Sequence, residues 1–344
     1  LINGMDGAGK GATVNLLNEW MDPRHIEACA FDSPTAAESE YPEMWRFWRS
    51  LPPRGKIGVL FNNWYGQVIV DRVERRSRRA DLEQRLDEIR RFESMLVREG
   101  VLLIKFWFHV SRAVQKQHFK ALEKDPRTRW RVTRRDWRAH DLYGRYRDVA
   151  GQVLRSSSTG EAPWLIVDGS DANFRALFVG RTLLSAITKR LEAVRRKWAP
   201  RQTAAPLAPA VDTVNLIGSL QRHEMGHKEY DEQLERHQGR LALLTRDDAF
   251  RKRSLVLVFE GMDAAGKGGA IRRISAALDI RQYRIVQVAA PTEEERAQPY
   301  LWRFWRHVPR RGKIAVFDRS WYGRVLVERV EGYCSEADWM RAYS

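Results

Sequence analysis

One eight-residue block occurs twice in this chain, far apart. Residues 4–11 read Gly-Met-Asp-Gly-Ala-Gly-Lys-Gly, and residues 261–268 read Gly-Met-Asp-Ala-Ala-Gly-Lys-Gly. The register then holds without a gap, because Trp-Arg-Phe-Trp-Arg at 45–49 returns at 302–306 and Trp-Tyr-Gly at 64–66 returns at 321–323. A period this long indicates duplicated domains rather than a solenoid of small repeats.

The repeated block has the pattern of a phosphate-binding loop. An apolar segment at 255–259 predicts a strand before it, and residues 270–278 predict a helix after it. Glycines in such a loop let backbone N–H groups surround phosphate oxygens, and the lysine adds a mobile positive charge. The predicted phosphate-binding residues are Gly261, Ala264, Ala265, Gly266, Lys267, Gly268 and Gly269 in the second copy, and Gly4, Asp6, Gly9, Lys10 and Gly11 in the first.

The loop also departs from the usual pattern. The position after the lysine is normally Ser or Thr, whose hydroxyl binds Mg2+, but here it is Gly11 and Gly268. Both copies instead carry an aspartate inside the loop, Asp6 and Asp263. A carboxylate there repels phosphate unless a metal or a proton lies between them. We therefore interpret Asp263 as a metal or water ligand, or as a base toward an accepting phosphate.

A second acidic strand completes the predicted catalytic set. Residues 314–317 are apolar and precede Asp318, which is where a phosphate-loop enzyme needs a carboxylate for Mg2+. We predict that Asp263 and Asp318 bind the metal, and that Lys267, Arg319 and Arg324 neutralise the transferred phosphoryl group. In the first copy Phe61 replaces this aspartate, so we expect it to bind phosphate without catalysis.

Two further features surround this predicted site. Thr292 and Glu295 follow a predicted strand, at the edge where α/β folds bind ligands, and we count them among the nucleotide-binding residues. The Trp-Arg-Phe-Trp-Arg block predicts a short helix with Trp302 and Trp305 on one face. Core packing is the favoured interpretation of that block, and contact of Arg303 or Arg306 with an anion is the alternative.

Composition limits the partners. The net charge of +16 comes largely from arginine, and it indicates a polyanionic partner. Cys29 and Cys334 are too few for a disulfide framework, which favours a reducing cytoplasm. The sequence contains no apolar run of transmembrane length and no recognisable nucleic-acid-binding motif. We expect no membrane and no specific nucleic-acid partner.

The whole chain predicts an α/β fold in tandem. Further strands are predicted at 101–107 and 164–168, and helices at 81–98 and 230–245, with a strongly basic segment at 111–147 and a Pro/Ala-rich linker at 198–212. The predicted domains are 1–198, with a degenerate site, and 251–344, which is catalytic, joined by 199–250. In the same register, the counterparts of Lys105 and Asp168 would lie beyond Ser344, so we expect the second copy to be incomplete.

Five motifs together resemble one family. They are Gly-x-Asp-x-x-Gly-Lys-Gly, Pro-Thr-x-x-Glu, Trp-Arg-Phe-Trp, Asp-Arg-Ser-Trp-Tyr and Lys-Phe-Trp-x-His-x-Ser, and they resemble the polyphosphate kinase 2 family. The resemblance implies a thymidylate-kinase-like, P-loop kinase-like parallel sheet flanked by helices. It also implies Mg2+, inorganic polyphosphate as the donor, a nucleotide as the acceptor, and a basic lid, visible here at 105–147. The tandem arrangement looks like the two-copy members associated with polyphosphate:AMP phosphotransfer.

These observations leave several functions open. The favoured one is Mg2+-dependent transfer of a phosphoryl group from polyphosphate to AMP, giving ADP, by a homo-oligomer. A polyphosphate-dependent ADP or GDP kinase is the alternative within enzymes. A non-catalytic scaffold that binds polyphosphate is the alternative outside them.

Overall fold

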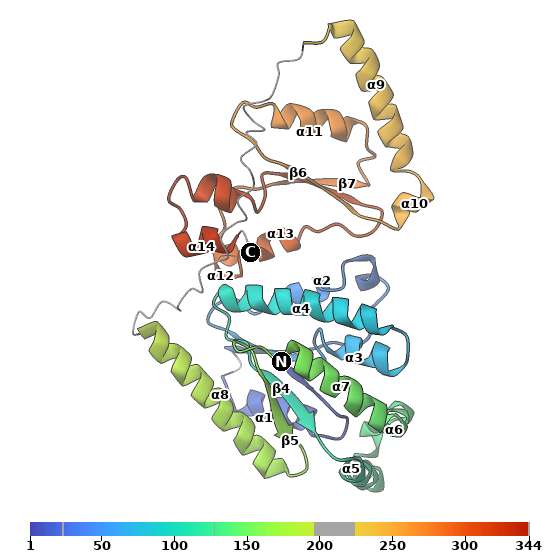
Figure 1. Cartoon of the computed structure of the whole chain (residues 1–344), viewed down its shortest axis with the longest axis vertical. Helices are drawn as coiled ribbons and strands as arrows, with labels where there is room; N and C mark the ends of the chain where they lie inside the picture. The colour runs from blue at the N-terminus through green and yellow to red at the C-terminus, as the bar shows by residue number, and fades with distance from the viewer. Residues whose placement is uncertain (23, 127, 196–223, 343–344) are drawn as a thin grey trace. The chain divides into compact units, whose positions relative to one another are not determined.

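The computed structural model describes residues 1–22, 24–126, 128–195 and 224–342 (Figure 1). These residues form two compact units, which are described separately. The first unit comprises Leu1–Pro34, Arg49–Trp198 and Ala297–Pro299. The second comprises Thr35–Trp48, Ala199–Arg296 and Tyr300–Ser344.

The first unit contains a five-stranded parallel sheet in the order β2-β3-β1-β4-β5. Its strands are β1 (Ile2–Gly4), β2 (Ile26–Ala30), β3 (Ile57–Phe61), β4 (Lys105–His109) and β5 (Trp164–Asp168). Ile2 pairs with Phe61 on one side and Phe106 on the other, which places β1 and its loop in the middle of the sheet. β4 has Phe-Trp-Phe at its centre and is buried over four of its five residues, Lys105 included, as a central parallel strand should be.

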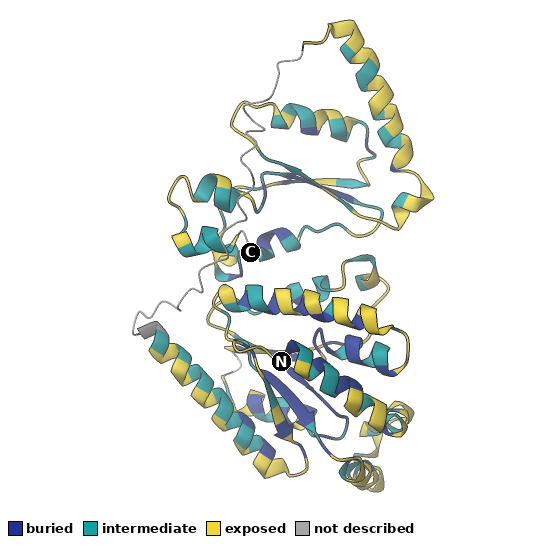
Figure 2. Cartoon of the chain, viewed as in Figure 1, coloured by how far each residue is buried: buried dark blue, intermediate teal, exposed yellow. Residues whose placement is uncertain are grey.

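Helices cover both faces of this sheet (Figure 1). They are α1 (Lys10–Trp20), α3 (Gly66–Val73), α4 (Arg79–Arg98), α5 (Arg112–Lys124), η2 (Arg129–Arg131), α6 (Arg134–Asp141), α7 (Tyr143–Ser157) and α8 (Ala172–Arg195). Contacts group α3, α4 and α7 in one layer and α1 with α8 in the other. Figure 2 shows strand β4 largely buried, with exposed residues on the outer helix faces; the edge strand β5 is only partly buried.

The second unit contains a three-stranded parallel sheet in the order β6-β8-β7. Its elements are α9 (His227–Leu244), α10 (Asp248–Arg251), β6 (Leu255–Phe259), α11 (Lys267–Ala276), β7 (Tyr283–Gln287), α12 (Glu293–Ala297), α13 (Trp302–Trp305), β8 (Ile314–Asp318), the π-helix η3 (Arg324–Glu328) and α14 (Glu336–Arg341). Strands β7, β8 and β6 repeat the order of β2, β3 and β1 in the first unit. The segment Thr35–Trp48, with η1 (Glu38–Glu40) and α2 (Trp45–Trp48), also belongs to this unit, where Trp48 stacks on Trp305.

Strand β8 divides the core of the second unit into two layers. Successive side chains of a strand point to opposite faces. Ile314 and Val316 therefore pack with Ile271 of α11 and Leu241 of α9 on one face. On the other face Ala315 and Phe317 pack with Phe304 of α13, whose ring also meets Trp321 edge-on at 5.9 Å between centroids. The core-packing interpretation of the Trp-Arg-Phe-Trp block is therefore confirmed for its phenylalanine.

The predicted parallel α/β fold is confirmed, and most predicted elements are present. The prediction of a strand at 101–107 is wrong at its start, because β4 begins at Lys105. Gly100, with φ 92°, follows the end of α4, and the Val101 N–H bonds back to the Leu96 carbonyl, so residues 100–101 still belong to the helix end. The helix predicted at 270–278 begins earlier, at Lys267.

The linker, the apolar length of the helices and the domain limits complete the comparison with the predicted fold. The predicted linker at 198–212 lies outside the described residues. Among the residues that the structure describes, no helix is both long and apolar enough to cross a membrane. The domain limits at 198 and 250 stay a prediction.

Candidate active site

The second loop lies open at the carboxyl end of β6. Residues 261–266 are all exposed, and Gly266 caps α11 in the left-handed conformation, with φ 83°. Lys267 begins the helix, so the N–H groups of its first turn point toward the loop, where an anion is favoured. The Lys267 Nζ donates to the carbonyl oxygens of Gly261 at 2.7 Å and Met262 at 2.8 Å. The structure thus places the predicted residues Gly261, Ala264, Ala265, Gly266, Gly268 and Gly269 in one loop and helix start.

Asp318 and Arg319 reach the same edge from β8. Parallel pairing sets Phe259 opposite Asp318, so the residues that follow both strands are neighbours. The Arg319 N–H donates to the Phe259 carbonyl at 3.0 Å. Its guanidinium Nη2 lies 2.8 Å from Oδ1 of Asp263, forming an ion pair that joins the loop to β8. Two residues that are 56 positions apart, and that the sequence assigns to one site, are therefore in contact.

Arg319 adopts a backbone conformation that arginine rarely accepts. Its φ is 65°, in the left-handed region. Its counterpart Asn62 has φ 51°, and asparagine tolerates this region much better. Left-handed backbone costs an ordinary L residue about 1–2 kcal/mol. Backbone strain of this kind clusters at functional sites. The strain at Arg319 is therefore consistent with a functional role for its side chain.

Sequence analysis missed Glu260, the residue between β6 and the loop. Its Oε1 accepts a hydrogen bond of 2.6 Å from the Ser320 hydroxyl, which is part-buried. The corresponding pair in the first unit is Asn3 and Asn63, with 2.8 Å between Nδ2 and Oδ1. Both members of the contact change together between the copies. That paired exchange, visible once the two copies are aligned, is the signal that could have revealed Glu260.

Three other predicted site residues make structural contacts. Thr292 and Glu295 bond reciprocally, Thr292 N–H to Glu295 Oε2 at 2.9 Å and Glu295 N–H to Thr292 Oγ1 at 3.2 Å, which is a capping box at α12. The Arg324 Nε donates to Glu328 at 3.2 Å, and its guanidinium lies 3.6 Å from the centroid of the Tyr300 ring. Burial raises the pKa of Tyr300. None of these contacts excludes a ligand, so the three assignments stay predictions.

The alternative that Arg303 or Arg306 faces an anion has little support. The Arg303 side chain is buried and donates to the Ala289 carbonyl at 2.7 Å, with Glu295 at 3.5 Å. Arg306 lies over the Trp302 ring, with Glu294 at 3.5 Å. Each guanidinium group therefore already lies within ion-pair distance of a carboxylate of the same unit.

The carboxylates of the site suit a divalent cation. Mg2+ prefers oxygen ligands, usually one or two carboxylates completed by phosphate oxygens and water. Asp263 and Asp318 supply two such carboxylates at one edge of the sheet. Within the described ranges no cluster of three or more His, Cys, Asp or Glu side chains could hold a metal. An ion held by these two carboxylates would take its other ligands from phosphate and water.

The first loop has nearly the same sequence but a different environment. Lys10 is buried, and its Nζ donates to the carbonyls of Gly4 at 2.6 Å and Met5 at 3.1 Å. The third contact is Asp6 Oδ1, also at 3.1 Å. In this unit the loop carboxylate therefore pairs with the loop lysine, because Asn62 cannot supply the charge that Arg319 gives to Asp263. Lys10 also lies 5.9 Å from the ring centroid of Phe61, which stands where Asp318 stands in the second unit.

Helices α5 and α8 cover this first loop. Gln115 of α5 donates to the Asp6 carbonyl at 2.9 Å, and His118 Nδ1 lies 2.8 Å from the Gly7 carbonyl. From α8, the Arg175 guanidinium packs so closely on Gly9 that an added Cβ would come within 2.3 Å of its Cζ. His140 of α6 is buried, and its Nδ1 lies 2.7 Å from Oε1 of Gln115. Burial lowers the pKa of His140. The basic segment predicted as a lid is thus helical and closed over the first loop; Gly11, at the start of α1, is exposed.

Comparison with known proteins gives the family. The polyphosphate kinase 2 family model matches residues 1–195 and 224–344. Polyphosphate:AMP phosphotransferases from Pseudomonas aeruginosa and Pseudomonas syringae are 55% and 50% identical over the whole chain, which spans 69% of each. The crystal structure of a putative polyphosphate kinase 2 from Pseudomonas aeruginosa is 50% identical, with a TM-score of 0.84; the match covers 99% of this chain and 66% of that one. The chain belongs to the polyphosphate kinase 2 family.

Proposed function

We propose that the protein transfers the terminal phosphoryl group of inorganic polyphosphate to AMP, and that its second unit carries the chemistry. The observation that carries the proposal is the ion pair between Asp263 and Arg319, which joins an open phosphate loop to a strand that ends in Asp318. Three similar proteins named polyphosphate:AMP phosphotransferase support the choice of donor and acceptor.

The proposed reaction forms one P–O bond and breaks another. An oxygen of the AMP phosphate attacks the terminal phosphorus of polyphosphate, and the bridging oxygen leaves with the shortened chain. The protein supplies positioning and charge neutralisation, which are the main contributions a protein makes to phosphoryl transfer. In this proposal Lys267 and Arg319 bind the equatorial oxygens of the transferred group. Arg324 would have to leave Glu328 to join them.

Asp263 and Asp318 would hold Mg2+, which supplies charge neutralisation between donor and acceptor phosphates when bound. Metal dependence of this protein is therefore part of the proposal. So is a cytoplasmic location, which rests on the two cysteines, Cys29 and Cys334, both free in the structure. A homo-oligomer also stays a proposal.

A different acceptor is the second candidate. Similar proteins include an AMP/ADP-polyphosphate phosphotransferase from Meiothermus ruber and an NDP-polyphosphate phosphotransferase from Ruegeria pomeroyi, at 26% and 32% identity over little more than half of this chain. An ADP or GDP kinase would use the same donor and the same charged groups. The higher identity of the AMP-named relatives favours AMP.

Product analysis tests this function. The full-length protein is incubated with AMP, ADP or GDP as acceptor and with polyphosphate or ATP as donor, each with and without EDTA. We expect ADP from AMP and polyphosphate, and loss of product with EDTA. Faster conversion of ADP or GDP than of AMP would favour the second candidate. Transfer from ATP alone, with none from polyphosphate, would contradict both.

A further inference from the structure

Glu260 and Ser320 tie down the turn that carries Arg319, and the reaction described above gives neither of them a role. The Arg319 N–H donates to the Phe259 carbonyl at 3.0 Å, and the hydroxyl of the next residue, Ser320, donates to Oε1 of Glu260 at 2.6 Å. Two consecutive residues at the end of β8 are therefore tied to two consecutive residues at the end of β6. A hydroxyl that donates to a carboxylate at this distance makes a hydrogen bond roughly twice as strong as one between neutral groups.

The Ser320 side chain is held from two directions. It is 2% exposed, and its hydroxyl oxygen also accepts the Tyr322 N–H at 3.2 Å. The Ser320 carbonyl accepts the Gly323 N–H at 3.0 Å. Because a serine hydroxyl carries a single proton, the contact with Glu260 uses the only donor of this side chain. The orientation of Ser320 therefore depends on Glu260.

The backbone beside this contact is strained. Arg319 has φ 65°, a left-handed conformation that is unfavourable for an L residue. Such a conformation persists only where the surrounding structure imposes it. A return of Arg319 to negative φ would move its guanidinium away from Asp263, whose Oδ1 now lies 2.8 Å from Nη2. The hydrogen bond between Glu260 and Ser320 opposes that return, because Ser320 directly follows Arg319.

The first unit repeats this arrangement with neutral groups. The Asn62 N–H donates to the Ile2 carbonyl at 3.3 Å, and Nδ2 of Asn3 donates to Oδ1 of Asn63 at 2.8 Å. The same Asn63 oxygen accepts the Tyr65 N–H at 3.3 Å, as the serine hydroxyl accepts a tyrosine N–H in the second unit. The pattern of contacts is therefore shared by the two units, and its chemistry differs.

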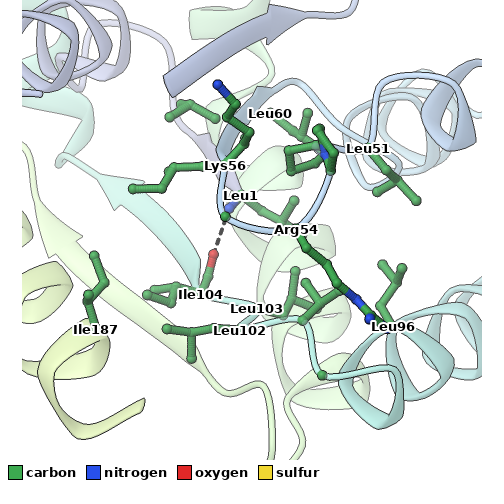
Figure 3. A pocket seen from close by; sticks show the side chains of 18 of the residues that line it. Leu1, Leu51, Arg54, Lys56, Leu60, Leu96, Leu102, Leu103, Ile104 and Ile187 are labelled. Atoms are coloured by element: carbon green, nitrogen blue, oxygen red, sulfur yellow. Dashed lines mark hydrogen bonds between the residues drawn. The ribbon is translucent and has the colours of Figure 1, made fainter. Parts of the chain in front are cut away.

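Each pair suits its own unit. Asn63 is fully buried, and Leu60, whose carbonyl accepts from its Nδ2 at 3.1 Å, lines an apolar pocket of the first unit together with Trp64 (Figure 3). A carboxylate in such surroundings would lose its hydration, whereas two amides bond without charge. Glu260 is only half-buried. The charged and stronger pair thus occurs where the residue with positive φ is arginine, and the neutral pair occurs where it is asparagine, which tolerates this conformation.

We propose that Glu260 is a positioning residue for the transfer reaction. Its carboxylate holds Ser320, and through Ser320 it holds Arg319 in the strained conformation that places the guanidinium on Asp263. The proposal rests on the proposed function, because that function gives Arg319 its role at the transferred phosphoryl group. It requires Glu260 only as a hydrogen-bond acceptor, and it gives this residue neither a metal nor a proton to bind.

Kinetics of ADP formation by the full-length protein test this role. Glu260→Ala removes the acceptor, so kcat should fall by about a hundredfold, as expected for a displacement of about 1 Å in a reacting group. The KM for AMP should stay unchanged, because the lost interaction acts in the transition state. Glu260→Gln keeps an oxygen that accepts from Ser320 and should lose no more than about tenfold. Ser320→Ala should match Glu260→Ala, because both variants break the same hydrogen bond.

The first unit supplies both a rescue and a control. Glu260→Asn alone should lower kcat, and the addition of Ser320→Asn should recover about tenfold, because the two changes together install the amide pair of the first unit. Asn63→Ala breaks the equivalent contact in the first unit, and it should leave kcat unchanged when the assay is run below its Tm.

Equal losses in Glu260→Gln and Glu260→Ala, without recovery in the double asparagine variant, would overturn the proposal, because they would assign a metal or a proton to the Glu260 charge. An unchanged kcat in Glu260→Ala would also overturn it. Hydrogen exchange separates these results from a failure of the proposed function. Even if the parent forms no ADP, faster exchange of the Arg319 amide in Glu260→Ala would support the positioning contact, and an equal rate would contradict it.

Discussion

The two loops differ at one position in eight, Gly7 against Ala264, and yet they lie in opposite environments. The first is covered by α5 and α8, and its lysine is buried among acceptors of its own loop. The second is exposed, and its aspartate pairs with an arginine from the neighbouring strand. In the register of the repeat the counterparts of α5 and α8 would fall beyond Ser344, so the informative difference is the partner of the loop aspartate: Lys10 in one unit and Arg319 in the other. The residues that end the adjacent strand decide what the loop aspartate can do.

The motif Trp-Tyr-Gly shows the same contrast. Tyr65 is fully buried in the first unit, while Tyr322 is 54% exposed in the second. In the first unit Trp64 donates to Glu93 at 3.0 Å, and Glu93 pairs with buried Lys105 at 2.7 Å. Burial lowers the pKa of Lys105, and its ion pair with Glu93 opposes that shift. The tyrosine of this motif thus belongs to a packed core in one unit and is half-exposed in the other, while the tryptophan packs against neighbouring aromatic rings in both.

Replacing the strand-end residues should produce the largest difference between the units. Asp318→Asn removes a proposed metal ligand, so kcat for ADP formation should fall by at least about a hundredfold. Phe61→Leu, at the equivalent position, should leave kcat unchanged. Steady-state assays on the full-length protein measure both. Similar losses in the two variants would mean that both units take part in catalysis.

Breaking the buried ion pair should destabilise the first unit only. Glu93→Ala leaves the Lys105 charge without its carboxylate, which should lower the free energy of unfolding by about 3–5 kcal/mol. Hydrogen exchange of β4 and α7 under increasing urea would report it unit by unit. The double variant Glu93→Gln with Lys105→Met should lose much less. If exchange in β6 and β8 accelerates as much as in β4, the units are not independent.

Acid should loosen the cover of the first loop before it affects the second loop. Burial lowers the pKa of His140 below 6.5, with Arg112 and Lys116 adding to the shift and Asp141 opposing it. Between the unfolded pKa of 6.5 and the lowered pKa, the unfolded chain binds more protons than the folded one, so stability falls as the pH falls across that window and levels off below it. Exchange of α5 amides measured from pH 7.5 to 5 should show this. His140→Gln should flatten the dependence; an unchanged slope would exclude His140 as its source.

The smallest expected effect concerns the one position at which the loops differ. Ala264 has φ 63°, a conformation that costs an alanine about 1–2 kcal/mol. Ala264→Gly relieves that strain but increases the conformational entropy of the unfolded chain, which lowers stability by about 0.4–1 kcal/mol. The Tm of the second unit should therefore rise by a few degrees at most. The reverse change, Gly7→Ala, should lower stability, because the new Cβ would lie 3.0 Å from Phe119. A lower Tm for Ala264→Gly would contradict the strain argument.

Local patterns predicted the sheets and one edge of the site well. Leu255–Phe259 and Ile314–Asp318 are short apolar runs that end in a loop or an acid, and parallel strands bring such ends together. The contact of Asp263 with Arg319 follows from that rule. Thr292 and Glu295 have capping-box spacing, which the sequence also contains, so their structural role could have been predicted.

The cover of the first loop could not be predicted in the same way. It depends on contacts between residues far apart in sequence, such as Gln115 with Asp6 and Arg175 with Thr13. No periodicity or local motif encodes which helix returns to which loop. The start of β4 was also not predictable, because the apolar run 101–104 continues into the strand and no local signal marks its beginning at Lys105.

The central claim is that the second unit performs the transfer and the first does not, and two lysine variants test it most directly. Kinetics of ADP formation from AMP and polyphosphate are measured for Lys10→Ala and Lys267→Ala in the full-length protein, below the Tm of each. Lys267→Ala should lower kcat by at least about a hundredfold. Lys10→Ala should keep a kcat close to that of the parent and lose about 1–3 kcal/mol of stability, since two buried carbonyls and the part-exposed Asp6 carboxylate lose their donor. A loss of kcat in Lys10→Ala as large as that in Lys267→Ala would contradict the account.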